Sequence, residues 1–358
     1  MNYYNQPYYN PPLSGEPMVY HPKYGYITPK KLERKEIRNN VTKVFGAVLG
    51  TVLASYIVGF ALGFILPFMG VNYNYNLYPD SYGFPPVLAH LLGYISVVLC
   101  TGLPFIIYAV AKRQSPTRYF RFEKVGAGTG FMFLLAGSGV VMLANFPSGW
   151  LTSLLNGLGF PSEMPESLPI DNPLLAILYF GSVAIMPAIF EELAIRGVLL
   201  SSLRKHGNAF ALVISSLSFA FLHYNLPQVF FAFICGLVLG YVYLRTNNLW
   251  ICIGIHMINN GIAVIMEILY AYLPSGTADI VTTILFYGTI LLGIIFLIIL
   301  IATKRLHFRF AKPEPSEEPA FYAPSASKAV GLLTSPTFII TGIICLFLVI
   351  RNTFWPML

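Results

Sequence analysis

Long apolar segments constrain this chain more than any other feature. Its 358 residues are 56% hydrophobic and 10% charged, whereas soluble domains carry roughly 25% charged residues. A transmembrane helix needs about 20 apolar residues, and the segment 208–223 is barely long enough. The predicted spans cover about 44–69, 87–111, 126–146, 173–205, 208–223, 227–245, 249–272, 279–303 and 332–350. We therefore predict an all-α, polytopic membrane bundle of eight core spans with a ninth C-terminal span.

Polar and charged segments divide the chain around these spans. Residues 1–30 are rich in tyrosine and proline without apolar periodicity, so residues 1–42 are predicted to be a disordered tail with a basic juxtamembrane segment. The membrane bundle then occupies 43–303, a charged linker 304–331, and the extra span with a short tail 332–358. The net charge of +7 comes from basic residues beside apolar segments, which indicates membrane orientation and not nucleic-acid binding.

The basic residues predict the orientation of the bundle. With the N-terminus inside, every loop rich in lysine and arginine falls on one side of the membrane and every basic-poor loop on the other. We therefore expect an integral, multi-pass membrane protein with a cytoplasmic N-terminus, in the cell membrane if the source is bacterial. The four cysteines all lie in apolar runs without CxxC spacing, which is typical of small buried hydrophobic residues.

Two adjacent carboxylates, Glu191 and Glu192, interrupt the apolar run 177–200, whose only other charged residue is Arg196. An ionised carboxylate in a low dielectric is strongly destabilising unless it is paired. Glu192 and Arg196 share a helix face in the favourable acid-first order, so we predict a structural ion pair. Glu191 lies about 100° round the helix from Glu192 and is left to face a cavity. The alternative is an ordinary helix end, with all three residues at the cytoplasmic water interface.

Two further segments carry polar residues in apolar helices. Phe219 and His223 are four residues apart at the end of the short span, where a lone histidine is more often a packing residue. His256 and Asn260 share one face of a later span, and Asn259 is predicted to point away from that face. Three independent polar clusters in hydrophobic helices favour a buried functional site.

This pattern resembles the CPBP family of intramembrane proteases, which includes the CAAX prenyl endopeptidases and bacterial relatives also called Abi proteins. The motifs EExxxR, FxxxH and HxxxN occur in this order on successive hydrophobic helices. They are complete here in the segments 191–196, 219–223 and 256–260. The resemblance covers about residues 173–262, and the N-terminal tail and the ninth span lie outside it.

The resemblance implies an endopeptidase that hydrolyses a peptide bond with an activated water. Glu191 with His223 would position and deprotonate the water, and His256 with Asn260 would donate hydrogen bonds to the developing oxyanion. The structural support would come from Glu192, Arg196 and Phe219. A metal variant would use Glu191, His223 and His256 as ligands of a divalent ion such as zinc. A route without a tightly held metal explains the same residues, and it is the one we expect.

The expected partners are the lipid bilayer and a peptide or membrane-protein substrate, which is lipidated if the CAAX analogy extends to it. Two other functions suit buried polar residues in a membrane bundle: a non-catalytic immunity or scaffold protein, and a proton-coupled transporter. The intact motifs argue against the first function, and the lack of a repeated half argues against the second.

Overall fold

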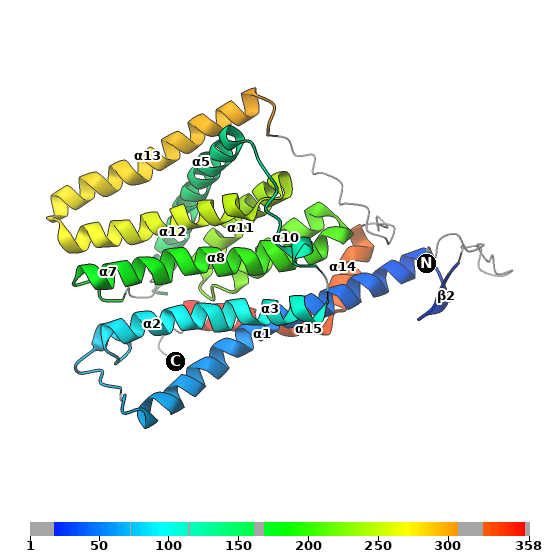
Figure 1. The fold of residues 1–358 in the computed structure, drawn as a ribbon, viewed down its shortest axis with the longest axis horizontal. Helices are drawn as coiled ribbons and strands as arrows, with labels where there is room; N and C mark the ends of the chain where they lie inside the picture. The colour runs from blue at the N-terminus through cyan, green and yellow to red at the C-terminus, as the bar shows by residue number, and fades with distance from the viewer. Residues whose placement is uncertain (1–17, 72, 114, 161–167, 307–324, 355–358) are drawn as a thin grey trace.

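The computed structural model describes residues 18–71, 73–113, 115–160, 168–306 and 325–354, and this part of the chain is almost entirely helical (Figure 1). The prediction of an all-α membrane bundle is confirmed. Within these described ranges, eight helices are long and apolar enough to cross a membrane. They span Pro29–Phe68, Pro86–Ala111, Ala127–Gly157, Pro173–His206, Leu226–Thr246, Leu249–Tyr272, Ser275–Ala302 and Pro336–Phe354.

Several spans consist of shorter helical pieces joined end to end. The first three contain α1 (Pro29–Phe68), α2 (Pro86–Ser96), the π-helix η3 (Val97–Gly102), α3 (Leu103–Ala111), α5 (Ala127–Leu143) and α6 (Asn145–Gly157). The fourth contains α7 (Pro173–Phe180), the π-helix η4 (Gly181–Ile185), α8 (Met186–Glu192), the π-helix η5 (Leu193–Leu200), α9 (Ser201–Leu203) and the 3₁₀ helix η6 (Arg204–His206). Then follow α10 (Asn208–Phe221), α11 (Leu226–Thr246), α12 (Leu249–Tyr272), α13 (Ser275–Ala302), α14 (Ser325–Leu333) and α15 (Pro336–Phe354). The short helices η2 (Pro79–Ser81) and α4 (Pro116–Tyr119) lie in connections.

Helix α10 is shorter than the predicted fifth span. Its 14 residues measure about 21 Å, well short of a hydrocarbon core of about 30 Å. It pairs closely with α11, where a Cβ added to Gly236 would lie 2.9 Å from Cβ of Ser216. The turn after α10 contacts α15, because the Leu226 N–H donates a hydrogen bond to Thr353 Oγ1 at 3.1 Å. The eight candidate spans are therefore seven of the predicted core spans and the C-terminal one.

The N-terminal region is more ordered than its composition predicts. Strands β1 (Val19–His21) and β2 (Gly25–Ile27) form an antiparallel hairpin within the segment predicted to be disordered. Gly25 closes its turn with φ +66°, a conformation that glycine adopts without steric cost. Val19 and Ile27 pack with Leu32 at the start of α1, and this burial stabilises the hairpin. Residues 1–17 of the predicted tail lie outside the described residues, as does 307–324 of the predicted linker.

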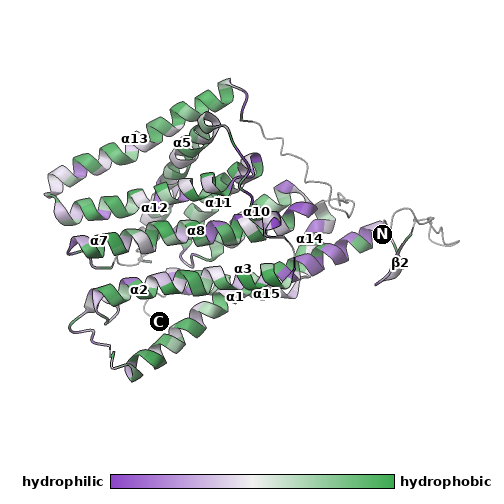
Figure 2. Ribbon diagram, in the orientation of Figure 1, coloured by the Kyte–Doolittle hydropathy of each residue, from purple (hydrophilic) through white to green (hydrophobic). Residues whose placement is uncertain are grey.

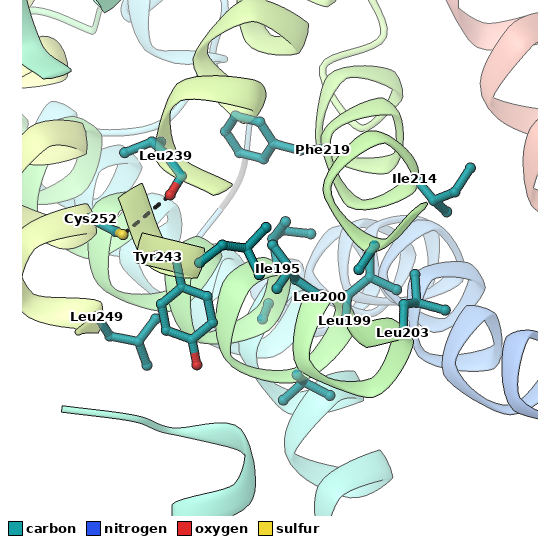
Figure 3. Packing of buried hydrophobic residues seen from close by; sticks show 14 of the residues in the cluster. Ile195, Leu199, Leu200, Leu203, Ile214, Phe219, Leu239, Tyr243, Leu249 and Cys252 are labelled. Carbon is teal, nitrogen blue, oxygen red and sulfur yellow. Dashed lines mark hydrogen bonds between the residues drawn. The ribbon is translucent and has the colours of Figure 1, made fainter. Parts of the chain in front are cut away.

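The helix that carries the two glutamates lies in the middle of the bundle (Figure 1). Its segment 195–203 is buried nearly all round, as expected for a helix that is apolar on every face. Figure 3 shows how residues of this segment pack against α10, α11 and α12. The labelled residues of this cluster are Ile195, Leu199, Leu200, Leu203, Ile214, Phe219, Leu239, Tyr243, Leu249 and Cys252.

The outer surface of the spans is apolar and suits contact with lipid. Phe60 and Phe68 of α1 are each 80% exposed. Figure 2 shows hydrophobic residues along most of α13 and the later turns of α1, and hydrophilic residues in the first turns of α1. All four cysteines are buried and free, in agreement with the sequence prediction.

Candidate active site

Glu192 and Arg196 form a salt bridge in the centre of the bundle. Arg196 Nη1 donates to Glu192 Oε1 at 2.6 Å, and neither side chain has exposed surface. The guanidinium also lies 4.6 Å from the centre of the Phe219 ring, a distance typical of a cation–π contact. These contacts join the central helix to α10. The pair is buried and does not lie at a water interface, the alternative that the sequence left open.

His256 connects the two glutamates. Its Nδ1 lies 2.9 Å from Glu192 Oε1, and its Nε2 lies 3.9 Å from Glu191 Oε2. Because an ionised carboxylate only accepts hydrogen bonds, Nδ1 carries the proton toward Glu192. Nε2 is then the nitrogen nearer to Glu191. The 3.9 Å between Nε2 and Glu191 Oε2 is too long for a direct hydrogen bond and suits a bridging water.

Asn260 compensates for a missing helical donor. Pro187 has no N–H, so the Val183 carbonyl four residues earlier lacks its usual α-helical partner. Asn260 Nδ2 donates to this carbonyl at 3.1 Å. The contact fixes the Asn260 side chain against the π-helical segment that precedes α8. It is an arrangement that the sequence analysis did not anticipate, although the position of Pro187 within an apolar helix was a usable signal.

Asn259 does not point away from the site as the sequence predicted. Its Nδ2 donates to Asn260 Oδ1 at 3.0 Å, and its side chain lines the same cavity as Glu191. The two amides thus form a short hydrogen-bonded chain that ends at the Val183 carbonyl. The expected hydrogen-bonding role of Asn259 is present, but it is directed toward the cavity.

His223 and Phe219 approach the cavity from α10. His223 Nδ1 lies 2.9 Å from the Phe219 carbonyl, which makes Nδ1 the donor and leaves Nε2 as an acceptor. The Phe219 ring contacts the imidazoles of both His223 and His256 edge-on, with centroid distances of 4.9 and 5.9 Å. Phe219 therefore fixes both rings as well as the Arg196 guanidinium.

A cavity of about 270 Å³ brings these side chains together. Glu191, His223, His256, Asn259 and Asn260 form its polar wall. The Glu191 side chain is 25% exposed and Glu192 is fully buried, so only one of the adjacent carboxylates reaches the cavity. The apolar part of the wall consists of Phe219, which the sequence analysis identified, and of Val183, Pro187, Phe231, Ala232 and Cys235, which it did not.

The side chains do not fit the three-ligand metal site considered from the sequence. Across the part of the chain that the structure describes, no three His, Cys, Asp or Glu side chains are grouped closely enough to hold a metal ion. The arrangement instead provides one cavity-facing carboxylate with imidazole and amide groups around it.

Comparison with known proteins agrees with this geometry. Residues 173–262, which contain every residue of the polar wall, match the family model described as "Type II CAAX prenyl endopeptidase Rce1-like". Over this segment the chain is similar to the CPBP family, as its three motifs predicted. It is also similar to a Bacillus subtilis (strain 168) protein described as "Putative membrane peptidase YdiL", with 22% identity over 182 residues that cover 51% of this chain and 74% of the relative. No solved structure matches the chain at a significant level.

The match to this family model and the eight apolar spans of the described residues support an integral, multi-pass membrane protein and, in general terms, an endopeptidase of the CAAX type.

Proposed function

We propose that this protein hydrolyses peptide bonds inside the membrane and that Glu191 is its general base. The observation that carries the proposal is the pairing of a cavity-facing Glu191 with His256, whose other nitrogen is held by the buried Glu192. A base must lie within reach of the proton that it removes, directly or through one water. The 3.9 Å gap between Glu191 Oε2 and His256 Nε2 suits a water held by both.

In the proposed reaction the water oxygen attacks the peptide carbonyl carbon as Glu191 removes one of its protons. The C–N bond then breaks, and the leaving nitrogen receives that proton, which gives a free amine and a carboxylic acid. Glu191, Glu192 and Arg196 together carry one net negative charge, and protonation of His256 would bring the cluster to neutrality. An electrically neutral cluster is favoured in a low dielectric, so the proton that Glu191 takes from the water can pass to His256 Nε2, 3.9 Å away, before it reaches the leaving nitrogen.

The oxyanion is stabilised by N–H donors on the wall opposite Glu191. Asn260 is held by Val183 and by Asn259, and each primary amide has two N–H donors. We assign Asn260 to the oxyanion, with Asn259 as a positioning residue and His256 as a second donor once protonated. His223 is assigned to positioning of the water through its Nε2 acceptor. Hydrogen-bond donors that are fixed in position before the reaction stabilise the oxyanion more than donors that must reorganise during it.

The proposed substrate is a peptide or a segment of a membrane protein, with or without a lipid group. The apolar wall around Phe231 and Ala232 suits an apolar side chain next to the scissile bond. We also assign the N-terminus to the cytoplasmic side. Lys43, Lys112 and Lys205 lie together at the same end of the bundle, as the positive-inside rule requires of cytoplasmic segments.

The test is identification of cleavage products in cells. Membranes that contain the wild-type protein are compared with membranes that contain Glu191→Gln, and new protein N-termini are identified by mass spectrometry. Glu267→Gln is the matched control, because Glu267 is another carboxylate of the spans but accepts a hydrogen bond from Tyr179. We expect N-termini that appear with wild type and Glu267→Gln and are absent with Glu191→Gln. An identical set of N-termini in all three samples would contradict the proposal.

A further inference from the structure

A second pocket lies outside the candidate active site, at the end of the bundle where α1 begins. Its volume is about 220 Å³. Four segments that are distant in the sequence contribute to it: the N-terminal hairpin, α1, the residue after α3, and η6. The lining residues are His21, Lys23, Tyr24, Glu36, Asn39, Asn40, Lys43, Lys112 and Lys205. None of these residues contributes to the cavity around Glu191.

The pocket carries a strong positive charge. Four lysines and one glutamate line it, which leaves three positive charges unbalanced within the lining. Burial lowers the pKa of Lys112, and the nearby charges of Lys43, Lys205 and Arg118 lower it further. The ammonium groups are therefore close enough to repel one another, and an anion bound between them would relieve this repulsion.

The pocket lies where lipid headgroups are expected. Two of the membrane spans end at Ala111 and His206, immediately beside Lys112 and Lys205. Both residues are half-buried. Basic pockets between transmembrane helices at this depth attract anionic headgroups from the surrounding leaflet.

The N-terminal hairpin forms the outer wall of the pocket. Lys23 Nζ and Lys35 Nζ lie 5.5 and 4.4 Å from the centre of the Tyr24 ring, both within the range of cation–π contacts. The contact of Lys35 attaches the hairpin to the first turns of α1, and the contact of Lys23 lies within the hairpin itself. The hairpin therefore adds a lysine and a hydrogen-bonding hydroxyl that the membrane spans alone would not provide.

We propose that this pocket binds a phosphate monoester and that the usual source is the headgroup of an anionic lipid. A phosphate group presents several oxygens in different directions, which matches ammonium groups that come from α1, the end of α3 and η6. Lysine binds phosphate as a point charge and needs no planar geometry. A carboxylate, with two oxygens in one plane, would satisfy fewer of these donors. The site is independent of the proposed peptidase activity.

The test uses the full-length protein purified in an uncharged detergent. Binding of short-chain phosphatidic acid is titrated by native mass spectrometry, with short-chain phosphatidylcholine as the neutral lipid and inorganic phosphate as the free anion. The pocket variant is Lys43→Gln with Lys112→Gln. The matched control is Lys31→Gln with Lys124→Gln, which removes the same charge at exposed positions outside the pocket. A third variant, Lys43→Arg with Lys112→Arg, keeps the charge.

We expect the pocket variant to bind phosphatidic acid about 30-fold more weakly than wild type, since each juxtamembrane lysine contributes about a fivefold effect. The control and the arginine variant should stay within about threefold of wild type. Displacement of the lipid by inorganic phosphate would support the phosphate site and identify the free anion as a second source. Equal binding of phosphatidic acid by the pocket variant and its control, or equal binding of phosphatidylcholine by wild type, would overturn the proposal.

Discussion

The buried pair of Glu192 and Arg196 provides the sharpest test of the site's architecture. Replacement of Arg196 by Met removes the cation and leaves the Glu192 carboxylate with His256 as its partner in a fully buried position. Breaking one side of a buried ion pair typically destabilises a protein by about 3–5 kcal/mol, because the remaining charge is uncompensated. Loss of the contact with Phe219 at 4.6 Å adds about 1 kcal/mol.

The double variant Glu192→Gln with Arg196→Met should be more stable than Arg196→Met alone. It removes the buried charge altogether, while the Gln side chain can still accept a hydrogen bond from His256. Among the described residues, Glu192 Oε2 and Arg196 Nε have no hydrogen-bond partner, so the native pair is not fully satisfied. We therefore expect the double variant to lose only about 1–2 kcal/mol relative to wild type.

The free energy of unfolding is measured for wild type, both single variants and the double variant in mixed micelles, with detergent as denaturant and circular dichroism as the signal. The expected coupling energy between the two positions is at least about 2 kcal/mol. Equal losses in the Arg196→Met and double variants would refute the reasoning. So would a loss below about 1 kcal/mol in Arg196→Met, which is the value expected of a pair that water reaches.

Two further predictions follow from the site. Asn260→Ala should destabilise the protein by about 1–3 kcal/mol, because the Val183 carbonyl loses its donor. The loss should be smaller in the Pro187→Ala background, where a backbone N–H is restored. Equal losses in the two backgrounds, measured by the same unfolding assay, would contradict this role of Asn260. Chelation with EDTA should change the rate of peptide cleavage by less than about twofold, since the described residues offer no three-ligand metal site. A loss of cleavage rate of about tenfold or more that zinc reverses would contradict this prediction.

The sequence was sufficient for two features of the central helix. The contact between Glu192 and Arg196 follows from their spacing of four residues, and the exposure of Glu191 follows from its angular separation. The limits of α12 were also predicted, because the apolar run 249–272 coincides with the helix. In the structure Asn248 caps this helix by accepting a hydrogen bond from the Ile251 N–H.

Contacts between helices were not predictable in the same way. His256 and Glu192 are 64 residues apart, and Asn260 and Val183 are 77 residues apart. Helical periodicity identifies the face on which a side chain lies, but it does not identify the group across from that face. The orientation of Asn259 was wrong for a different reason: periodicity placed it off the face of His256 and Asn260, whereas its Nδ2 donates to Oδ1 of the adjacent Asn260.

Two errors in the fold have local physical causes. The fifth segment was predicted as a span that is barely long enough, and α10 has 14 residues, because the apolar composition that predicts a span does not mark where the helix ends. The hairpin at Val19–Ile27 was missed because composition averaged over the N-terminal segment hides two short apolar strands and the turn at Gly25.

The central claim is that Glu191 is the base for peptide hydrolysis, and the cleavage rate of Glu191→Gln tests it most directly. The purified protein is reconstituted in lipid vesicles with a substrate identified from the N-termini described above, and Glu267→Gln is the control. The substitution is isosteric, and Glu191 Oε2 lies 3.9 Å from His256 Nε2, so the free energy of unfolding should be unchanged. We predict a rate about 10²–10⁴-fold lower than wild type. A Glu191→Gln rate equal to that of wild type would contradict the account.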